Sequence, residues 1–214
     1  MSAWDASLWV GRRVDALLPG VVRRVSAGGH PQPRWLPRRV LTVVSADVDV
    51  TVGAGAVWFV LRPRSARARE HTALLEWYGG QWRHLGGGNG PLDDPVGLDV
   101  MEVRAGGGVL SRTRRHDPPR SSETAPWIAC ATIHLGRDVG HLLVGNRRFD
   151  VVGNRRFDAP ERRGLVVAWM SPPGSRGVRP AVVAFGRDGT ELSRLGPHDS
   201  LDTHAWARLR EEGV

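Results

Sequence analysis

The stretch TALLEWYGGQWRHLGGGNG, residues 72–90, contains the clearest local pattern in the chain. Its first half predicts two strands joined at Gly79-Gly80, because two glycines in a hairpin loop can both adopt positive φ without a Cβ clash. Trp77 and Trp82 flank this turn. We expect the second glycine run, GGGNG (86–90), to end the hairpin as a turn. A phosphate-binding loop would need a Lys-Ser/Thr and a helix after it, and neither follows.

Other parts of the chain also carry strand patterns. RVLTVVSADVDVTV (39–52) alternates, with valines 48, 50 and 52 on one face and Asp47 and Asp49 on the other, which is typical of a half-buried strand. LDVMEVRA (98–105) and VLSRTR (109–114) predict a second hairpin that turns through the three glycines between them. Short apolar runs predict further strands: AVWFVLR (56–62), WIACATIHL (127–135), HLLV (141–144), LVVAWM (165–170) and AVVAF (181–185).

These patterns predict a mainly β protein. We expect antiparallel sheets forming two packed β lobes, sandwich- or barrel-like, because hairpin spacing does not fit βαβ units. Apolar spacing predicts a short helix at each end, over residues 3–18 and 197–214. The segment RHDPPRSSETAP (115–126) holds three prolines and no apolar periodicity, which favours a connector. The expected domains are therefore residues 1–114, with the first lobe, and 127–214, with a second sandwich-like lobe.

The charge of the chain indicates an acidic partner. The net charge is +8, and all 30 basic residues counted as Lys or Arg are arginine. Arginine offers a planar fork of donors for carboxylate or phosphate, so we expect a protein with an acidic surface, with nucleic acid as the alternative. Codon usage in a GC-rich genome would also explain the absence of lysine, although it does not explain the net charge.

Other features concern the compartment. The single cysteine, Cys130, excludes an internal disulfide and lies in an apolar run, where a buried inert thiol is expected. The N-terminal residues lack the pattern of a secretory signal. No window approaches ~18 consecutive apolar residues, so we expect no membrane span and a cytoplasmic location.

A tandem repeat stands out in the second half. VGNRRFD occurs at 144–150 and again at 152–158. Gly-Asn is a hairpin turn signal, so the repeat is either a meander with turns at both copies or one hairpin with the second copy bulged out. The repeat brings arginines and aromatic rings together: Arg147, Arg148, Phe149, Arg155, Arg156 and Phe157. Such a cluster suits RNA or single strands, whereas a solvated edge hairpin would use the same arginines to discourage edge pairing.

Catalytic and metal motifs are weak. His134, His141 and Asp138 would make a conceivable metal site, but the chain has no HExxH and no paired cysteines, so we expect neither a metal nor a cofactor. A second candidate binding region is the first hairpin, with Trp77, Trp82, Glu76 and His84. Nine tryptophans against one tyrosine favour either core filling or a ring-lined platform for a sugar, a base or a peptide.

Three segments carry a resemblance: WYGGQWRHLGGGNG (77–90), GLVVAWM (164–170) and RPAVVAFGRDGTEL (179–192). Together they resemble a group of uncharacterised actinobacterial proteins that have a Trp-rich hairpin and a β-sandwich-like C-terminal half. The resemblance covers roughly residues 40–195 and implies no activity and no site residues.

The sequence therefore favours a non-catalytic binding or interaction module. Three alternatives stay open. The first is a nucleic-acid-binding protein that uses the Arg-rich repeat. The second is a small hydrolase-type enzyme with a pocket between the lobes, using Glu76, His84 or His134. The third is a structural subunit of a larger assembly.

Overall fold

The computed structural model describes residues 16–92, 100–112, 124–150, 164–171 and 178–199. Within these ranges the chain forms one helix, over residues 16–26, and eleven strands. The strands are β1 (Leu41–Asp49), β2 (Ala54–Leu61), β3 (Arg69–Tyr78), β4 (Gln81–Pro91), β5 (Met101–Leu110), β6 (Trp127–Leu135), β7 (Val139–Val144), β8 (Arg147–Asp150), β9 (Gly164–Ser171), β10 (Val182–Gly186) and β11 (Glu191–Leu195). The expected helix at 3–18 lies almost wholly outside the described residues, but its expected end is wrong, because the described helix continues through Pro19 and Gly20 to residue 26. Most of the helix expected at 197–214 also lies outside the described residues.

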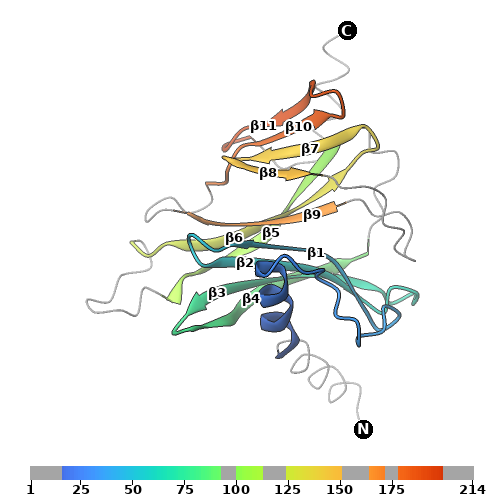
Figure 1. Cartoon of the computed structure of the whole chain (residues 1–214), viewed down its shortest axis with the longest axis vertical. Helices are drawn as coiled ribbons and strands as arrows, with labels where there is room; N and C mark the ends of the chain where they lie inside the picture. The colour runs from blue at the N-terminus through green and yellow to red at the C-terminus, as the bar shows by residue number, and fades with distance from the viewer. Residues whose placement is uncertain (1–15, 93–99, 113–123, 151–163, 172–177, 200–214) are drawn as a thin grey trace.

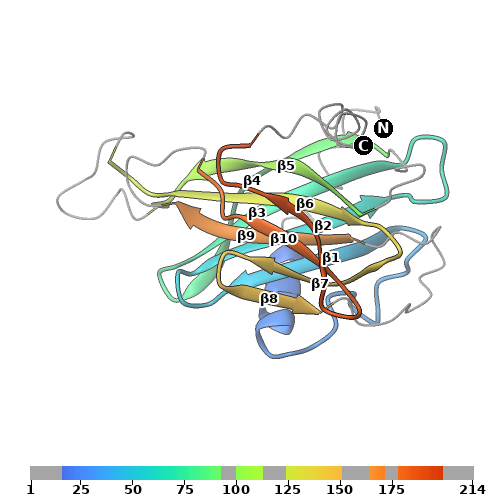
Figure 2. The ribbon, with the colours of Figure 1, turned by 90° about the horizontal axis from the view of Figure 1, so that it is seen from above.

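The strands form three antiparallel sheets stacked in layers (Figure 1). The first sheet has the order β1-β2-β3-β4, the central sheet β5-β6-β9, and the third sheet β11-β10-β7-β8. The helix lies below the first sheet in Figure 1, and Figure 2 looks down through the stack with the strands lying over one another. The expected mainly β, antiparallel, sandwich-like fold is confirmed, and the described strands form open sheets and no barrel.

Three apolar cores hold the layers together. The helix buries Leu18, Val21 and Val22 against the outer face of the first sheet. Trp58 and Leu74 of the first sheet pack against Ile128 and other residues of the central sheet. A third core fills the space between the central and third sheets, and its members include Val103, Ile133, Leu135, Leu142, Val144, Val182, Ala184 and Leu195. The central sheet is thus covered on both faces, which explains why β6 and β9 are almost continuously apolar.

The first hairpin forms as expected. β3 pairs with β4 from Tyr78 and Gln81 outward, and the loop between them is Gly79-Gly80. Both glycines have positive φ, 60° and 77°, as a type I′ turn requires. The glycines that follow do not form a turn, and that expectation is wrong, because residues 86–90 continue β4. A Cβ on Gly87 would lie 1.9 Å from the carbonyl oxygen of Thr72, so the close approach of β3 requires a glycine there.

A second glycine run is also part of a strand. The expected hairpin through residues 106–108 does not form, because β5 runs unbroken from Met101 to Leu110. Its pairing with β6 shifts between Ala105 and Gly107, so the glycines mark an irregularity in the ladder rather than a turn.

The two expected lobes share the central sheet. β5 precedes the expected connector at 115–126 and β6 follows it, and the two strands pair from Met101–Leu135 to Leu110–Trp127. β1 of the first sheet also lies along β9, which comes late in the chain. Segments from both halves of the sequence therefore contribute to each of the two inner cores.

A bulge in β1 decides which of its faces meets the central sheet. The register with β2 shifts between Val43 and Ser45, so residues after the bulge point to the opposite side. As a result Asp47 turns toward the central sheet and is buried. The expectation that valines 48, 50 and 52 form the buried face is wrong for the last two, because β1 ends at Asp49 and Val50 and Val52, in the turn that follows, are 68% and 40% exposed.

Candidate functional site

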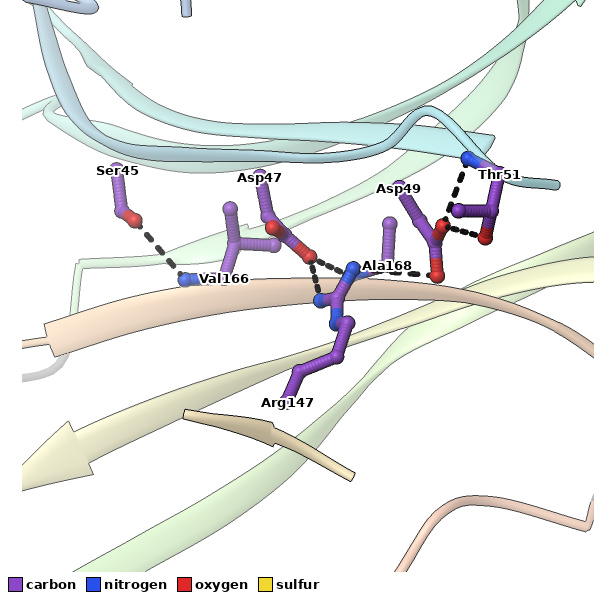
Figure 3. A network of polar contacts seen from close by, with 7 residues as sticks. All are labelled: Ser45, Asp47, Asp49, Thr51, Arg147, Val166 and Ala168. Atoms are coloured by element: carbon purple, nitrogen blue, oxygen red, sulfur yellow. Dashed lines mark hydrogen bonds and ion pairs between the residues drawn. The ribbon is translucent and has the colours of Figure 1, made fainter. Parts of the chain in front are cut away.

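Arg147, a predicted binding residue, lies in a partly buried polar network (Figure 3). Its guanidinium donates from Nη2 to Asp47 Oδ2, and Nη1 lies 3.4 Å from Asp49 Oδ2. Arg147 belongs to β8 of the third sheet, whereas both aspartates belong to β1 of the first sheet. The side chain therefore bridges the outer sheets around one edge of the central sheet, and it does not extend into solvent as a nucleic-acid contact would.

The same network covers the free edge of β9. Among the described strands β9 pairs only with β6, so the amides on its other side have no partner in a strand ladder. The Val166 N–H donates to Ser45 Oγ at 3.1 Å, and the Ala168 N–H donates to Asp47 Oδ2 at 2.8 Å. Side chains two residues apart in β1 thus satisfy amides two residues apart in β9, as a paired strand would.

The two aspartates differ in how they titrate. Burial raises the pKa of Asp47 above its ordinary value, and the charge of Arg147 and the Ala168 N–H offset only part of this effect. Burial also acts on Asp49, but hydrogen bonds from Thr51 and the charge of Arg147 outweigh it and lower that pKa. Asp47 is therefore the member of the network whose negative charge is costly to keep.

The rest of the first repeat copy is also engaged. Gly145-Asn146 forms the two-residue turn between β7 and β8, as the Gly-Asn signal predicts. Phe149 packs against the core between the central and third sheets, with the Arg147 guanidinium carbon 4.9 Å from its ring centroid. Arg148 is exposed and pairs with Asp150 at 2.8 Å. The other three predicted residues, Arg155, Arg156 and Phe157, lie outside the described residues.

The hairpin residues do not converge on one site. His84 lies opposite Leu75, which packs toward the helix, whereas Glu76 is on the other face of the first sheet. Trp82 is buried on the helix side, and Trp77, 49% exposed, meets it edge-on with ring centroids 5.7 Å apart. A pocket that combines Glu76 with His84 is therefore not formed.

Glu76 instead fixes the end of β5. Its carboxylate accepts hydrogen bonds from the Ser111 hydroxyl and from the Arg112 backbone N–H, the latter at 2.8 Å. Ser111 is fully buried, and Glu76 is almost so. This contact between residues far apart in sequence ties the first sheet to the central one.

The two histidines of the conceivable metal site lie in different sheets. His134 is buried edge-on against Trp58, at 4.9 Å between ring centroids, whereas His141 stacks on Phe185 in the third sheet at 4.8 Å. In the part of the chain that the structure describes, no group of three His, Cys, Asp or Glu could hold a metal ion. Burial raises the pKa of Cys130 to about 12, which makes it a poor nucleophile.

A surface that the sequence reading missed lies at one end of the first sheet. Leu41 pairs with Leu61, and the Arg62 N–H donates to Val40 O at 3.0 Å. The loop before β1 and the loop after β2 therefore leave the sheet together, on the right in Figure 1. We call this surface the basic end, and its residues are Arg34, Trp35, Arg38, Arg39, Arg62, Arg64, Arg67 and Arg69.

Two successive turns shape the loop that precedes β1. Hydrogen bonds from Leu36 N–H to Pro33 O (3.1 Å) and from Val40 N–H to Pro37 O (2.9 Å) close them. The turn tips are therefore Arg34-Trp35 and Arg38-Arg39. Trp35 is 70% exposed, the most exposed large apolar side chain among the described residues. The loop also encloses an open hollow of about 550 Å³ between His30 and Arg38.

Gln32 holds this loop against β1. Its side-chain Oε1 accepts from the Val43 N–H at 2.8 Å, and Nε2 donates to Leu36 O at 3.0 Å and to Leu41 O at 3.3 Å. The amide is buried, so these bonds form in a setting where their loss would leave backbone groups unpaired. The exposed Trp35 and its flanking arginines consequently stand on a fixed loop.

The basic end has little acidic compensation. Residues 16–46 contain five arginines and no Asp or Glu, and residues 54–69 contain four arginines and no Asp or Glu. Among the described residues, Arg34, Arg39, Arg62, Arg64 and Arg67 form no ion pair. These acid-free runs are the sequence signal that would have pointed to this surface.

Comparisons of the chain with family models, with curated proteins and with solved structures give no match. No helix within the described ranges is long and apolar enough to cross a membrane.

Proposed function

We propose that the protein is a binding module that recognises an acidic protein surface through the basic end. The observation that carries this proposal is local: nine arginines and no acidic residue occupy residues 16–46 and 54–69, and seven of these arginines belong to one end of the first sheet. Arginine pairs with carboxylates through two parallel hydrogen bonds, which gives direction as well as attraction.

Trp35 supports a protein partner. Arginine and tryptophan are enriched at protein interfaces, where a few such side chains carry most of the binding energy. Trp35 projects from a loop that Gln32 and two closed turns hold in place, so little conformational entropy is lost when a partner covers the ring. Val40, whose N–H closes the second turn of this loop, is also exposed and adds apolar surface to the same loop.

A charge-matched pair of variants tests the proposal. The triple variant Arg34→Ala, Arg39→Ala and Arg62→Ala removes three charges from the basic end. The control triple, Arg148→Ala, Arg187→Ala and Arg194→Ala, removes three exposed arginines from the third sheet and its β10–β11 turn. Both change the net charge equally, so any difference between them reports the local surface rather than the overall field.

The probe is a fluorescently labelled poly-glutamate peptide, titrated by anisotropy at several salt concentrations. We expect the basic-end triple to weaken binding at least tenfold and to flatten the salt dependence, and the control triple to change the affinity less than threefold. Equal weakening by both triples, or no salt-sensitive binding by the wild type, would overturn the proposal.

Nucleic acid is a second candidate, because the exposed Trp35 between arginines is the arrangement that stacks a base and pairs its phosphates. A labelled single-stranded oligonucleotide, titrated in the same way, separates the two candidates. Binding of the oligonucleotide without binding of the peptide, lost on Trp35→Ala but kept in Trp77→Ala, would favour nucleic acid over an acidic protein.

A further inference from the structure

Side chains of this protein cover two of its long strand edges. The edge of β9 is covered by Ser45 and Asp47, whose oxygens accept from its amides. The edge of β1 is covered by Gln32, whose side-chain amide accepts from the Val43 N–H and donates to Leu41 O. In both places a side chain binds backbone groups that a neighbouring strand would otherwise pair with. The two edges are therefore closed to a further strand.

The other edges of the described sheets are protected differently, with one exception. β8 and β11 have only four and five residues, and each carries an exposed ion pair, Arg148–Asp150 and Glu191–Arg194. The pairing of β5 with β6 shifts at the β5 glycines. Short length, charge and irregular pairing all discourage the addition of a strand. β4 is eleven residues long and has neither charge nor irregular pairing over residues 86–90.

Residues 86–90 form an exposed edge of the first sheet. Three of them, Gly87, Gly88 and Asn89, are exposed. β3 is the only described strand that pairs with β4. The Gly86 carbonyl lies 3.0 Å from His84 Nε2, and in the described part of the chain no other backbone group of residues 86–90 bonds outside β3. Since alternate residues of an edge strand direct their N–H and C=O groups away from their neighbour, this segment presents backbone groups to solvent.

An extended peptide is the ligand that matches such an edge, because its backbone offers the complementary row of donors and acceptors. Glycine in a strand suits the close approach of another backbone. The approach of β3 requires Gly87, but contacts within the chain do not require Gly90, where an added Cβ would meet nothing within 4 Å. The space beside the end of β4 is therefore open to a second backbone.

Charge indicates which extended peptide fits. β4 contains one arginine and one histidine, and no Asp or Glu. At its end Asn89 Oδ1 accepts from Arg69 Nη1 at 3.2 Å, and Arg69 belongs to the basic end, so the exposed edge is continuous with that surface. An acidic segment is attracted there. A second copy of this chain is repelled, because each copy has a net charge of +8.

We propose that an extended acidic segment of the partner adds to the first sheet as a fifth strand, beside β4. The inference rests on the proposed function for the acidity of the partner, whereas the pairing with β4 is a separate claim. The basic end binds the carboxylates, and the β4 edge binds the backbone. The conformation of the partner segment then contributes to recognition together with its charge.

The test compares two fluorescently labelled peptides of the sequence (Glu-Thr)6, titrated by anisotropy into the full chain. Threonine favours an extended strand, and the glutamates supply the charge. In the control peptide every backbone nitrogen is methylated, which keeps the carboxylates but removes the N–H donors. We expect the unmethylated peptide to bind at least tenfold more tightly, because strand pairing adds several backbone hydrogen bonds. The basic-end triple variant should weaken the binding of both peptides.

Amide hydrogen exchange then locates the bound peptide. Exchange should slow at residues 86–90 and stay unchanged at the edge strand β11, Glu191–Leu195. Equal binding of the two peptides, or unchanged exchange at residues 86–90, would refute strand addition and leave the basic end as a binding surface. Failure of both peptides to bind would refute the proposed function as well. A dimer in sedimentation whose residues 86–90 are already protected would assign this edge to a second copy and contradict the proposal.

Discussion

Removing the Asp47 carboxylate should destabilise the protein more than any loss of a surface charge. The carboxylate accepts from the Ala168 N–H and from Arg147, and it is buried between β1 and β9. In Asp47→Ala the Ala168 amide loses its acceptor away from water. The side chain of Arg147 keeps Asp49 at 3.4 Å and is about one-quarter exposed, so part of its interaction survives.

The size of the effect follows from these contacts. A buried donor left without an acceptor costs about 1–3 kcal/mol, and the weakened ion pair adds roughly 1 kcal/mol. The expected loss is therefore about 2–4 kcal/mol, a large share of the roughly 5–15 kcal/mol that separates folded from unfolded states. Arg147→Ala should cost about 1–3 kcal/mol, because it leaves the Asp47 charge buried with only backbone N–H groups, those of Ala168 and Val48, to stabilise it.

Urea unfolding at pH 7 followed by circular dichroism measures these losses. Arg148→Ala is the matched control: it is the neighbouring arginine of the same repeat, but its ion pair with Asp150 is 60% exposed on both sides. Its effect should stay within about 0.5 kcal/mol. Hydrogen exchange of the Ala168 amide should speed up in Asp47→Ala. Equal stabilities of the Arg147 and Arg148 variants, with unchanged exchange at Ala168, would refute the role assigned to this network.

Three further outcomes are expected. Gly87→Ala should lower the melting temperature sharply or prevent folding, because its Cβ would overlap Thr72 O, while Gly90→Ala should change it little; differential scanning calorimetry of both checks this. Burial raises the pKa of Asp47 above its ordinary value of 3.8, so ionising this carboxyl group costs stability in the folded protein. The stability of the wild type relative to Asp47→Asn should therefore be constant below pH 3.8 and decrease as the pH rises above it, as urea titrations from pH 3 to 7 would show. Cys130, with its pKa near 12, should resist Ellman's reagent in the native state and react quickly in 6 M urea; fast native labelling would contradict its burial.

Features that depend on neighbouring residues could be predicted from the sequence. The turns at Gly79-Gly80 and Gly145-Asn146 form because their conformations are set by the residues within them. The glycine runs at 86–90 and 106–108 also resemble turns, but both lie inside strands, where their role depends on a neighbouring strand. Gly87 is required by the carbonyl of Thr72 on the adjacent strand, and that contact cannot be read from the glycines themselves.

The candidate site was harder to predict because its contacts are long-range. Arg147 and Asp47 are 100 residues apart in the sequence. The first copy of the repeat therefore resembles an exposed arginine cluster, although Arg147 pairs with Asp47 in the fold. The basic end did leave a local signal, the two runs without acidic residues. Its meaning depends on the pairing of β1 with β2, which places the loops at Arg39 and Arg62 side by side.

The single extra residue in β1 makes this strand serve two cores in opposite phase. Ahead of the bulge, Leu41 and Val43 face the helix, and behind it Ser45 and Asp47 face the central sheet. Deleting one residue here would invert every position that follows, presenting apolar side chains to the amides of β9 and burying carboxylates under the helix. Insertions and deletions of odd length should therefore be excluded from this strand in any variant of the chain.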